Sequence, residues 1–166
     1  GVITGNTASM GIGGNLYVTK TGVVNISGNS VIDGGKTTGP GANIYTNGQI
    51  NIKGNDVQIL GGTVEGPGKN GIYITDLGSL FMEGGLISGG SALNGSGGNI
   101  CNYGTLNIVG ATINEGSAAK NADSIYGVGG VMHIEDSTIT NCLRVGKNVD
   151  FSLGGTVDIQ ELELPY

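Results

Sequence analysis

Residues 97–108 read GGNICNYGTLNI, and this pattern occurs at five places along the chain. In each copy, a block rich in Gly, Asn or Ser ends in an aliphatic residue, and a glycine then opens an alternating stretch. The aliphatic residues of the blocks lie 28, 28, 28 and 25 residues apart, at Leu16, Ile44, Ile72, Ile100 and Ile125. Self-similarity at such a period is typical of a repeat protein.

Two further rows have a similar period. The alternating stretches are GVVNI (22–26), GQINI (48–52), GSLFM (78–82), GTLNI (104–108) and GVMHI (130–134). A third row of isoleucines follows at Ile32, Ile59, Ile87, Ile113 and Ile139. Each repeat therefore predicts three short strands separated by Gly/Asn/Ser turns, with no helical stretch between them.

This repeat favours a solenoid over other all-β folds. Two-residue Asn-Gly or Asp-Gly turns do not join the strands into hairpins, and a propeller blade needs about 40 residues. Coils of 26–30 residues fit a single-stranded, right-handed parallel β-helix of about five to six coils, in which each strand pairs with its counterpart one coil later. Alternation directs Leu106 and Ile108 inward. The equivalent inward pairs are Val24/Ile26, Ile50/Ile52, Leu80/Met82 and Met132/Ile134.

The composition limits the class of protein. The 35 glycines follow no Gly-X-Y period, and 37% of residues are hydrophobic, which argues against collagen and against disorder. The net charge is −6 and the seven Lys and Arg residues are scattered, so we expect no nucleic-acid partner. No run of 18 apolar residues exists, so we expect no membrane insertion.

We interpret residues 1–166 as one β-helix domain. Residues 1–141 follow the repeat, whereas CLRVGKNVDFSL (142–153) lacks the expected aliphatic block. We therefore expect residues 142–166 to form an irregular last coil and a partial cap. Because the chain starts within a repeat, we expect it to be a segment of a larger protein.

The motifs ITGNTA (3–8), GGNLY (13–17), ISGGSA (87–92), GGNIC (97–101) and GTLNI (104–108) resemble the repeats of parallel β-helix domains in large bacterial surface proteins. These repeats are pectate-lyase-like and adhesin-type, and are similar to polymorphic outer-membrane protein repeats. The resemblance implies an extracellular or cell-surface location. It implies no single function, because this scaffold carries adhesins, polysaccharide-degrading enzymes and stalks.

The residue after each aliphatic position forms a row of tyrosines that is interrupted once. Its members are Tyr17, Tyr45, Tyr73, Cys101 and Tyr126. If the row faces outward, it is a candidate aromatic strip for sugar rings or a protein partner. Like residues also stack in solenoids simply because they pack well. An inward tyrosine row with outward isoleucines is the alternative orientation.

Acid/base candidates are sparse. Glu83 and Glu135 occupy the same outward row with Val109 between them, and Lys53 is expected to form a surface ion pair with Glu83. His133, the single histidine, lies two residues before Glu135. No Cys-x-x-Cys or Cys/His spacing is typical of a zinc site, so the sequence predicts no metal site and no cofactor. Catalytic residues are not predicted.

The two cysteines are not expected to form a disulfide. Cys101 takes a tyrosine position, whereas Cys142 is placed at a turn after the third strand, level with glycines of earlier coils.

The first functional hypothesis is a non-enzymatic scaffold, an adhesin-like binding or stalk segment whose partners are glycans or proteins on a host or neighbouring cell. The alternative is a carbohydrate-active or carbohydrate-binding domain of the pectate-lyase-like class. The third hypothesis is a structural module that associates end to end with other copies.

Overall fold

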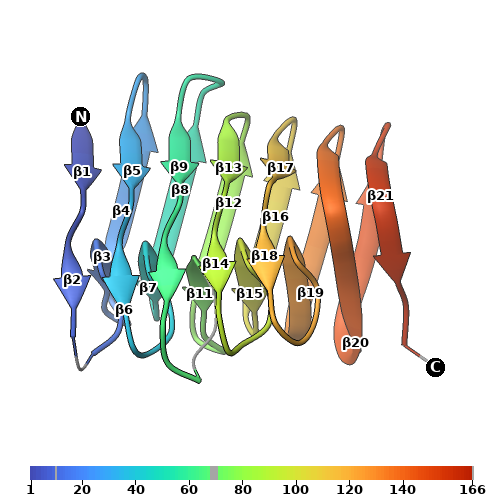
Figure 1. Ribbon diagram of the computed structural model, residues 1–166. Coiled ribbons are helices and arrows are strands. Elements are labelled where there is room, and N and C mark those ends of the chain that lie inside the picture. Colours follow the sequence, from blue (N-terminus) through green and yellow to red (C-terminus); the bar gives the residue numbers. More distant parts are fainter. Residues whose placement is uncertain (10, 68–70, 166) are drawn as a thin grey trace.

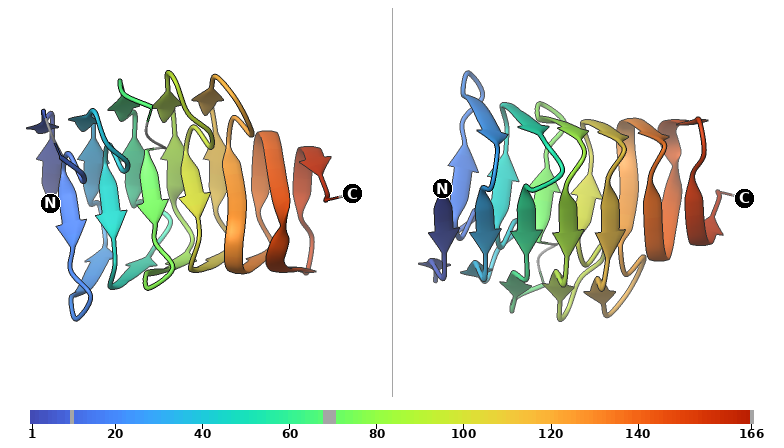
Figure 2. Two further views of the ribbon diagram at one scale, coloured as in Figure 1. Left: turned by 90° about the horizontal axis from the view of Figure 1, so that it is seen from below. Right: turned by 90° about the horizontal axis from the view of Figure 1, so that it is seen from above.

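The computed structural model describes residues 1–9, 11–67 and 71–165. The described chain is an all-β parallel solenoid of about five turns, with its two ends at opposite ends of the coil axis (Figure 1). Two further views show the strands of successive coils lying side by side along this axis (Figure 2).

Three faces share one large sheet. The tyrosine face contains β3 (Leu16–Val18), β7 (Ile44–Thr46), β11 (Ile72–Ile74) and β15 (Ile100–Asn102). The long-strand face contains β4 (Val23–Ser27), β8 (Gln49–Lys53), β12 (Ser79–Glu83) and β16 (Thr105–Val109). The third face contains β1 (Val2–Thr4), β5 (Val31–Asp33), β9 (Gln58–Leu60), β13 (Leu86–Ser88) and β17 (Thr112–Asn114).

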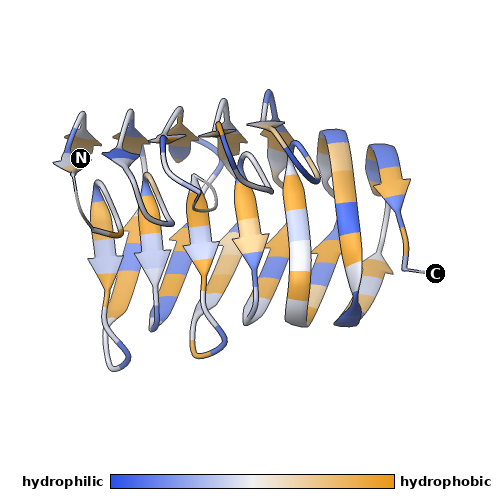
Figure 3. Cartoon of the chain, turned by 60° about the horizontal axis from the view of Figure 1, so that its bottom comes forward, coloured by the Kyte–Doolittle hydropathy of each residue, from blue (hydrophilic) through white to orange (hydrophobic). Residues whose placement is uncertain are grey.

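The register between coils is the one that the repeat predicts. Ile44 pairs with Ile72, Ile72 with Ile100 and Ile100 with Ile125, all in parallel strands. Leu106 and Ile108 are fully buried, and their counterparts in neighbouring coils form one continuous core with the other isoleucine rows. The alternation is visible as hydrophobic and hydrophilic bands along the strands (Figure 3). Each fully buried aliphatic side chain contributes about 1.5–3 kcal/mol.

A fourth row of strands, absent from the sequence prediction, closes each coil. It forms a separate five-stranded parallel sheet of two-residue strands: β2 (Thr7–Ala8), β6 (Lys36–Thr37), β10 (Thr63–Val64), β14 (Ser91–Ala92) and β18 (Ser117–Ala118). These pairs are too short to produce an alternation that can be recognised in the sequence.

The corners between faces stack in rows of left-handed residues. After the third-face strand, Gly5, Gly34, Gly61 and Gly89 have φ between 58° and 72°, and Glu115 holds the equivalent position with φ 52°. This region favours glycine because it has no Cβ. The glycines therefore set the direction of the chain at this corner.

Buried asparagines fill a different corner. The Asn15 side chain donates a hydrogen bond to Asn43 Oδ1 at 2.9 Å, and Asn43 donates to the Leu60 carbonyl at 2.9 Å. The Asn99 amide donates to the Asn114 carbonyl and accepts from the Gly90 N–H, both at 2.8 Å. These asparagines act through side-chain hydrogen bonds, and none of the three has a positive φ. Asn70, the first residue of the NGIY block, lies outside the described residues.

The last coils differ from the sequence expectation. β19 (Ile125–Glu135) and β20 (Thr138–Gly154) run through corners that separate strands in earlier coils. Leu143 pairs with Ile125, and Phe151 pairs with Met132, so most of segment 142–153 continues the coil with a single shift of register near Gly127. The segment is thus more regular than expected, because Leu143 supplies the aliphatic residue without a Gly/Asn block before it. β21 (Asp158–Glu163) then pairs with β20.

Candidate functional site

The tyrosine row faces outward. Tyr45 is partly exposed, whereas Ile44 and Thr46 on either side of it are fully buried. Tyr17 is 48% exposed at the start of the row, and Tyr73 is partly exposed. Parallel pairing places Tyr17 beside Tyr45 and Tyr45 beside Tyr73. The alternative orientation, with isoleucines outside, does not occur.

The rings of this row lie against one another. The centroids of Tyr17 and Tyr45 are 5.5 Å apart with the planes inclined at 33°. Those of Tyr45 and Tyr73 are 5.3 Å apart, and the planes are inclined at only 16°. Because parallel strands are about 4.8 Å apart, one ring per coil suffices for a continuous stack.

Tyr103 continues the stack where the row has a cysteine. Cys101 pairs with Tyr73 and is completely buried. The Tyr103 ring lies 5.5 Å from the Tyr73 ring, with the planes inclined at 46°. Sequence reasoning missed Tyr103 because it lies outside the aligned position. Tyr103 lies just beyond the end of β15, so strand alternation does not place it, and only the register between coils shows that it lies beside Tyr73.

The row continues to Tyr126 and ends at a cation. Tyr126 pairs with Cys101 on one side and with Arg144 on the other. The guanidinium carbon of Arg144 lies 6.0 Å from the centroid of the Tyr126 ring, within the range of a cation–π contact. The strip, defined as Tyr17, Tyr45, Tyr73, Tyr103 and Tyr126, therefore has an aromatic end and a positively charged end.

Polar groups border the strip. The Asn47 side chain donates a hydrogen bond to the Tyr17 hydroxyl at 3.3 Å. Burial, with smaller contributions from Cys101, Tyr45 and Asp76, raises the pKa of Tyr73 to about 12. Burial also raises the pKa of Tyr45. These hydroxyls consequently stay protonated near neutral pH, where each can donate and accept a hydrogen bond.

Stacking decides which part of each ring a ligand can reach. A ring face that lies against its neighbour is shielded, so a partner meets mainly ring edges and hydroxyls along the strip. Tyr17, of which 48% is exposed, is the most accessible residue of the strip. The surface thus offers a repeated apolar edge with a hydroxyl, suited to an extended ligand that repeats at a similar interval.

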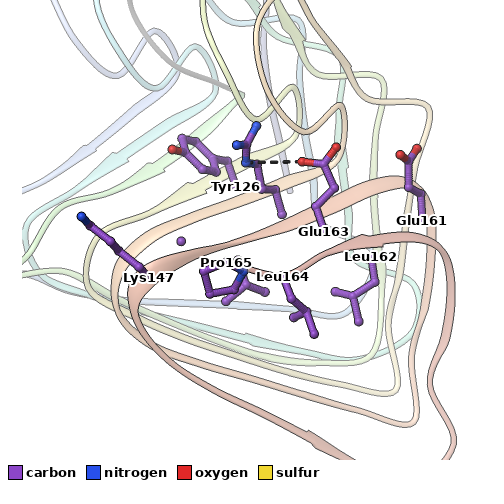
Figure 4. Close-up of a pocket in the computed structure, with 10 residues that line it drawn as sticks. Tyr126, Lys147, Glu161, Leu162, Glu163, Leu164 and Pro165 are labelled. Atoms are coloured by element: carbon purple, nitrogen blue, oxygen red, sulfur yellow. Dashed lines mark ion pairs between the residues drawn. The ribbon is translucent and has the colours of Figure 1, made fainter.

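At the end of the strip, Tyr126 lines a groove of about 950 Å³ (Figure 4). Tyr126, Arg144, Lys147 and Glu163 contribute to its lining, and Arg144 forms an ion pair of 3.3 Å with Glu163. Residues Leu162, Leu164 and Pro165 of the C-terminal segment line the rest. The groove is therefore lined by both charged and apolar side chains.

Glu83 does not join an acid/base pair. Its carboxylate forms the expected ion pair with Lys53, at 3.1 Å and with both side chains more than 60% exposed. Val109 lies between Glu83 and Glu135 in the register. Two carboxylates on opposite sides of an intervening strand do not cooperate as a compact catalytic dyad.

His133 and Glu135 do lie together, and Ser152 joins them. His133 Nε2 is 3.3 Å from Glu135 Oε2, and His133 Nδ1 is 2.8 Å from Ser152 Oγ. Ser152 comes from β20 and could be found only from the register between β19 and β20. A hydrolase triad also needs donors for an oxyanion and a site that excludes water. The His133 and Glu135 side chains are 31% and 42% exposed, so the three residues form a hydrogen-bond network at the surface.

The two cysteines occupy different environments and are both thiols. Cys101 is in β15 below the tyrosine strip. Cys142, which was predicted at a turn, is instead inside β20 and pairs with Glu161 of β21. Burial and the nearby Glu163 and Glu161 carboxylates raise the pKa of the Cys142 thiol to about 11.

Within the described residues, no helix is long and apolar enough to cross a membrane. No protein-family model, curated protein or solved structure matches the chain.

Proposed function

We propose that this chain is a non-enzymatic binding scaffold at the surface of a bacterial cell and that its tyrosine strip binds an extended, neutral glycan. The observation that carries the proposal is the continuity of the strip: Tyr17, Tyr45, Tyr73 and Tyr103 stack at intervals of 5.3–5.5 Å on one outer face. A packing role alone needs no hydroxyls at these positions, whereas a glycan uses both the apolar edge and the hydroxyl of tyrosine.

The spacing of the rings supports an extended ligand. It is close to the length of one sugar residue in a straight, β-linked chain, so successive sugars would meet equivalent groups. Asn47 beside Tyr17 adds an amide, and Asp76 follows β11 beside Tyr73 and adds a carboxylate. Amides and carboxylates are suitable partners for sugar hydroxyls.

The charge supports a neutral polymer over an acidic one. The chain has a net charge of −6, and Asp76 lies near the centre of the strip, where its charge acts on Tyr45 and Tyr73. Repulsion therefore disfavours uronic-acid polymers along most of its length. The location at a cell surface rests on the resemblance of the repeats to those of bacterial surface proteins.

A non-catalytic role agrees with the placement of the acid/base candidates. Glu83 is paired with Lys53 on an exposed surface, and His133 with Glu135 lies on the long-strand face. Neither group borders the tyrosine strip, so neither would meet a glycan bound there.

A glycan array tests the proposal with three proteins: the wild type, the double variant Tyr45→Ala/Tyr73→Ala, and Phe81→Ala as a matched control. Phe81 is also a partly exposed aromatic residue, but it lies on the long-strand face. We expect neutral β-linked polysaccharides to bind the wild type and Phe81→Ala but not the double variant.

Two results would contradict the proposal: no glycan binding by the wild type, or equal binding by the double variant. Release of reducing ends or unsaturated products from any polysaccharide would instead support the carbohydrate-active alternative.

A further inference from the structure

A second candidate site lies where the last two strands meet. β21 pairs with β20 so that Cys142 is opposite Glu161 and Arg144 is opposite Glu163. The Cys142 sulfur and one carboxylate oxygen from each of Glu161 and Glu163 all lie within 4.8 Å of one another. The separation of Cys142 from the two glutamates in the sequence matches no metal-binding motif. Only the pairing of β20 with β21 brings the three residues together.

The three donors border a small cavity of about 250 Å³ that is separate in its lining from the tyrosine strip. A zinc ion bound by sulfur at about 2.3 Å and oxygen at about 2.0–2.2 Å places such donors roughly 3.5 Å from one another. Glu161 and Glu163 are both exposed. Rotation of these side chains is therefore enough to close the donor set around one ion.

The Cys142 side chain is an independent indication of a ligand. It lines this cavity although the residue is only 8% exposed. In the part of the chain that the structure describes, its sulfur makes no hydrogen bond. Cys142 lies outside the cluster of hydrophobic core residues, and its sulfur is directed at the carboxylates of Glu161 and Glu163 and at the cavity.

The charge at this cavity favours a cation. Asp123 and the two glutamates contribute three negative charges, and Lys120 and Arg144 contribute two positive charges. The remaining charge is −1. A divalent ion that displaces the thiol proton adds a net charge of +1 and leaves the cluster neutral.

We propose that Cys142, Glu161 and Glu163 form a binding site for a borderline transition-metal ion of the zinc class. Binding forms a metal–sulfur bond and breaks the S–H bond, and the proton is released to water. Thiolate with carboxylates suits Zn²⁺, whereas Ca²⁺ and Mg²⁺ prefer oxygen ligands alone.

The ion pair of Arg144 with Glu163 is compatible with the site. Arg144 Nε contacts Oε2 of Glu163 at 3.3 Å, which leaves the second carboxylate oxygen for the metal. Arg144 also donates to the Asn121 side chain and packs against Tyr126. These contacts hold its charge beside Glu163 and orient that carboxylate.

Metal binding would link the last two strands of the solenoid. β21 is the last described strand and pairs with β20 alone. A metal ion shared by Cys142 and the two glutamates would join these strands through side chains. We therefore expect the metal to stabilise the end of the solenoid beside the Tyr126 groove.

Titration with Co²⁺ tests the site directly, because a cobalt–thiolate bond produces a near-ultraviolet charge-transfer band. The reduced, metal-free protein is titrated first with Co²⁺ and then with Zn²⁺. We expect a band that saturates at one ion per chain and disappears when Zn²⁺ displaces Co²⁺. We also expect Zn²⁺ to raise the unfolding temperature.

Variants assign the ligands. Cys142→Ser should abolish the band, and Glu161→Gln should weaken Co²⁺ binding at least about 10-fold. Glu161 is exposed, so its variant is expected to fold like the wild type. Glu83→Gln, an exposed carboxylate on another face, is the matched control and should bind as the wild type does. Absence of the band in the wild type, its persistence in Cys142→Ser, or unchanged affinity in Glu161→Gln would overturn the proposal.

Discussion

The ring of Tyr103 lies 5.5 Å from the ring of Tyr73, although the residue that pairs with Tyr73 in the sheet is Cys101. The aromatic stack therefore extends into the coil in which the sequence repeat lacks its tyrosine. The small, buried Cys101 side chain leaves the outer surface of this coil to Tyr103, two residues further along the chain. A residue outside the aligned position thus supplies the fourth ring of the stack.

Replacement of Tyr103 should interrupt the strip and lower stability. We expect Tyr103→Ala to reduce the free energy of unfolding by about 0.5–1.5 kcal/mol from the lost ring pair, with a further loss from the apolar area exposed. Chemical denaturation measures this change. Tyr103→Phe keeps the ring and should keep most of the stability. An equal loss in both variants would mean that the hydroxyl, and not the ring contact, is the stabilising group.

Stability should fall at high pH because of Tyr73. Its pKa is raised from 10.0 to about 12 in the folded protein, so the unfolded chain loses this proton at a lower pH than the folded chain. The contribution of Tyr73 is fully present below pH 10 and is lost as the pH rises toward 12. Denaturation midpoints measured across this range should decline less in Tyr73→Phe than in the wild type. Parallel declines would show that Tyr73 is not responsible.

The sequence predicts the three main faces well because their aliphatic rows are regular. Ile44, Ile72, Ile100 and Ile125 recur at nearly constant spacing and all become fully buried. The short sheet could not be predicted, because two-residue strands such as Thr63–Val64 contain no alternation. The course of β20 was also missed. The positions of Leu143 and Phe151 are determined by the pairing of β20 with β19, and no local sequence motif indicates that pairing.

The candidate sites were predictable only where their residues share a repeat position. Tyr17, Tyr45, Tyr73 and Tyr126 share one and were found in the sequence. Three other side-chain contacts depend on the register between coils and could not be predicted without it. They are the contact of Tyr103 with Tyr73, of Ser152 with His133, and of Cys142 with Glu161 and Glu163.

The buried Asn99 amide should be essential for its corner. Asn99 is 1% exposed, and its two hydrogen bonds satisfy the Gly90 N–H and the Asn114 carbonyl. Asn99→Ala leaves the buried Gly90 N–H without its acceptor and removes one of the two hydrogen bonds to the Asn114 carbonyl, which also accepts from the Gly89 N–H. This should cost about 1–3 kcal/mol. Asn107→Ala is the control, because the buried Asn107 Oδ1 has no hydrogen-bond partner among the described residues. Equal unfolding free energies for the two variants would contradict this role.

Gly104 should tolerate no side chain, because adjacent coils approach closely at this corner. A Cβ at this position would lie 2.2 Å from the carbonyl oxygens of both Thr75 and Gly78. Both obstructing atoms belong to the backbone of the preceding coil, so relief requires the coils to separate. We expect Gly104→Ala to destabilise the protein by about 1–3 kcal/mol or more. The control is Gly129→Ala, where the nearest atom would be the Tyr103 carbonyl oxygen at an ordinary contact distance of 3.7 Å. Thermal unfolding of the two variants measures the difference, and a Gly104→Ala protein as stable as Gly129→Ala would show that the coils can separate here at little cost.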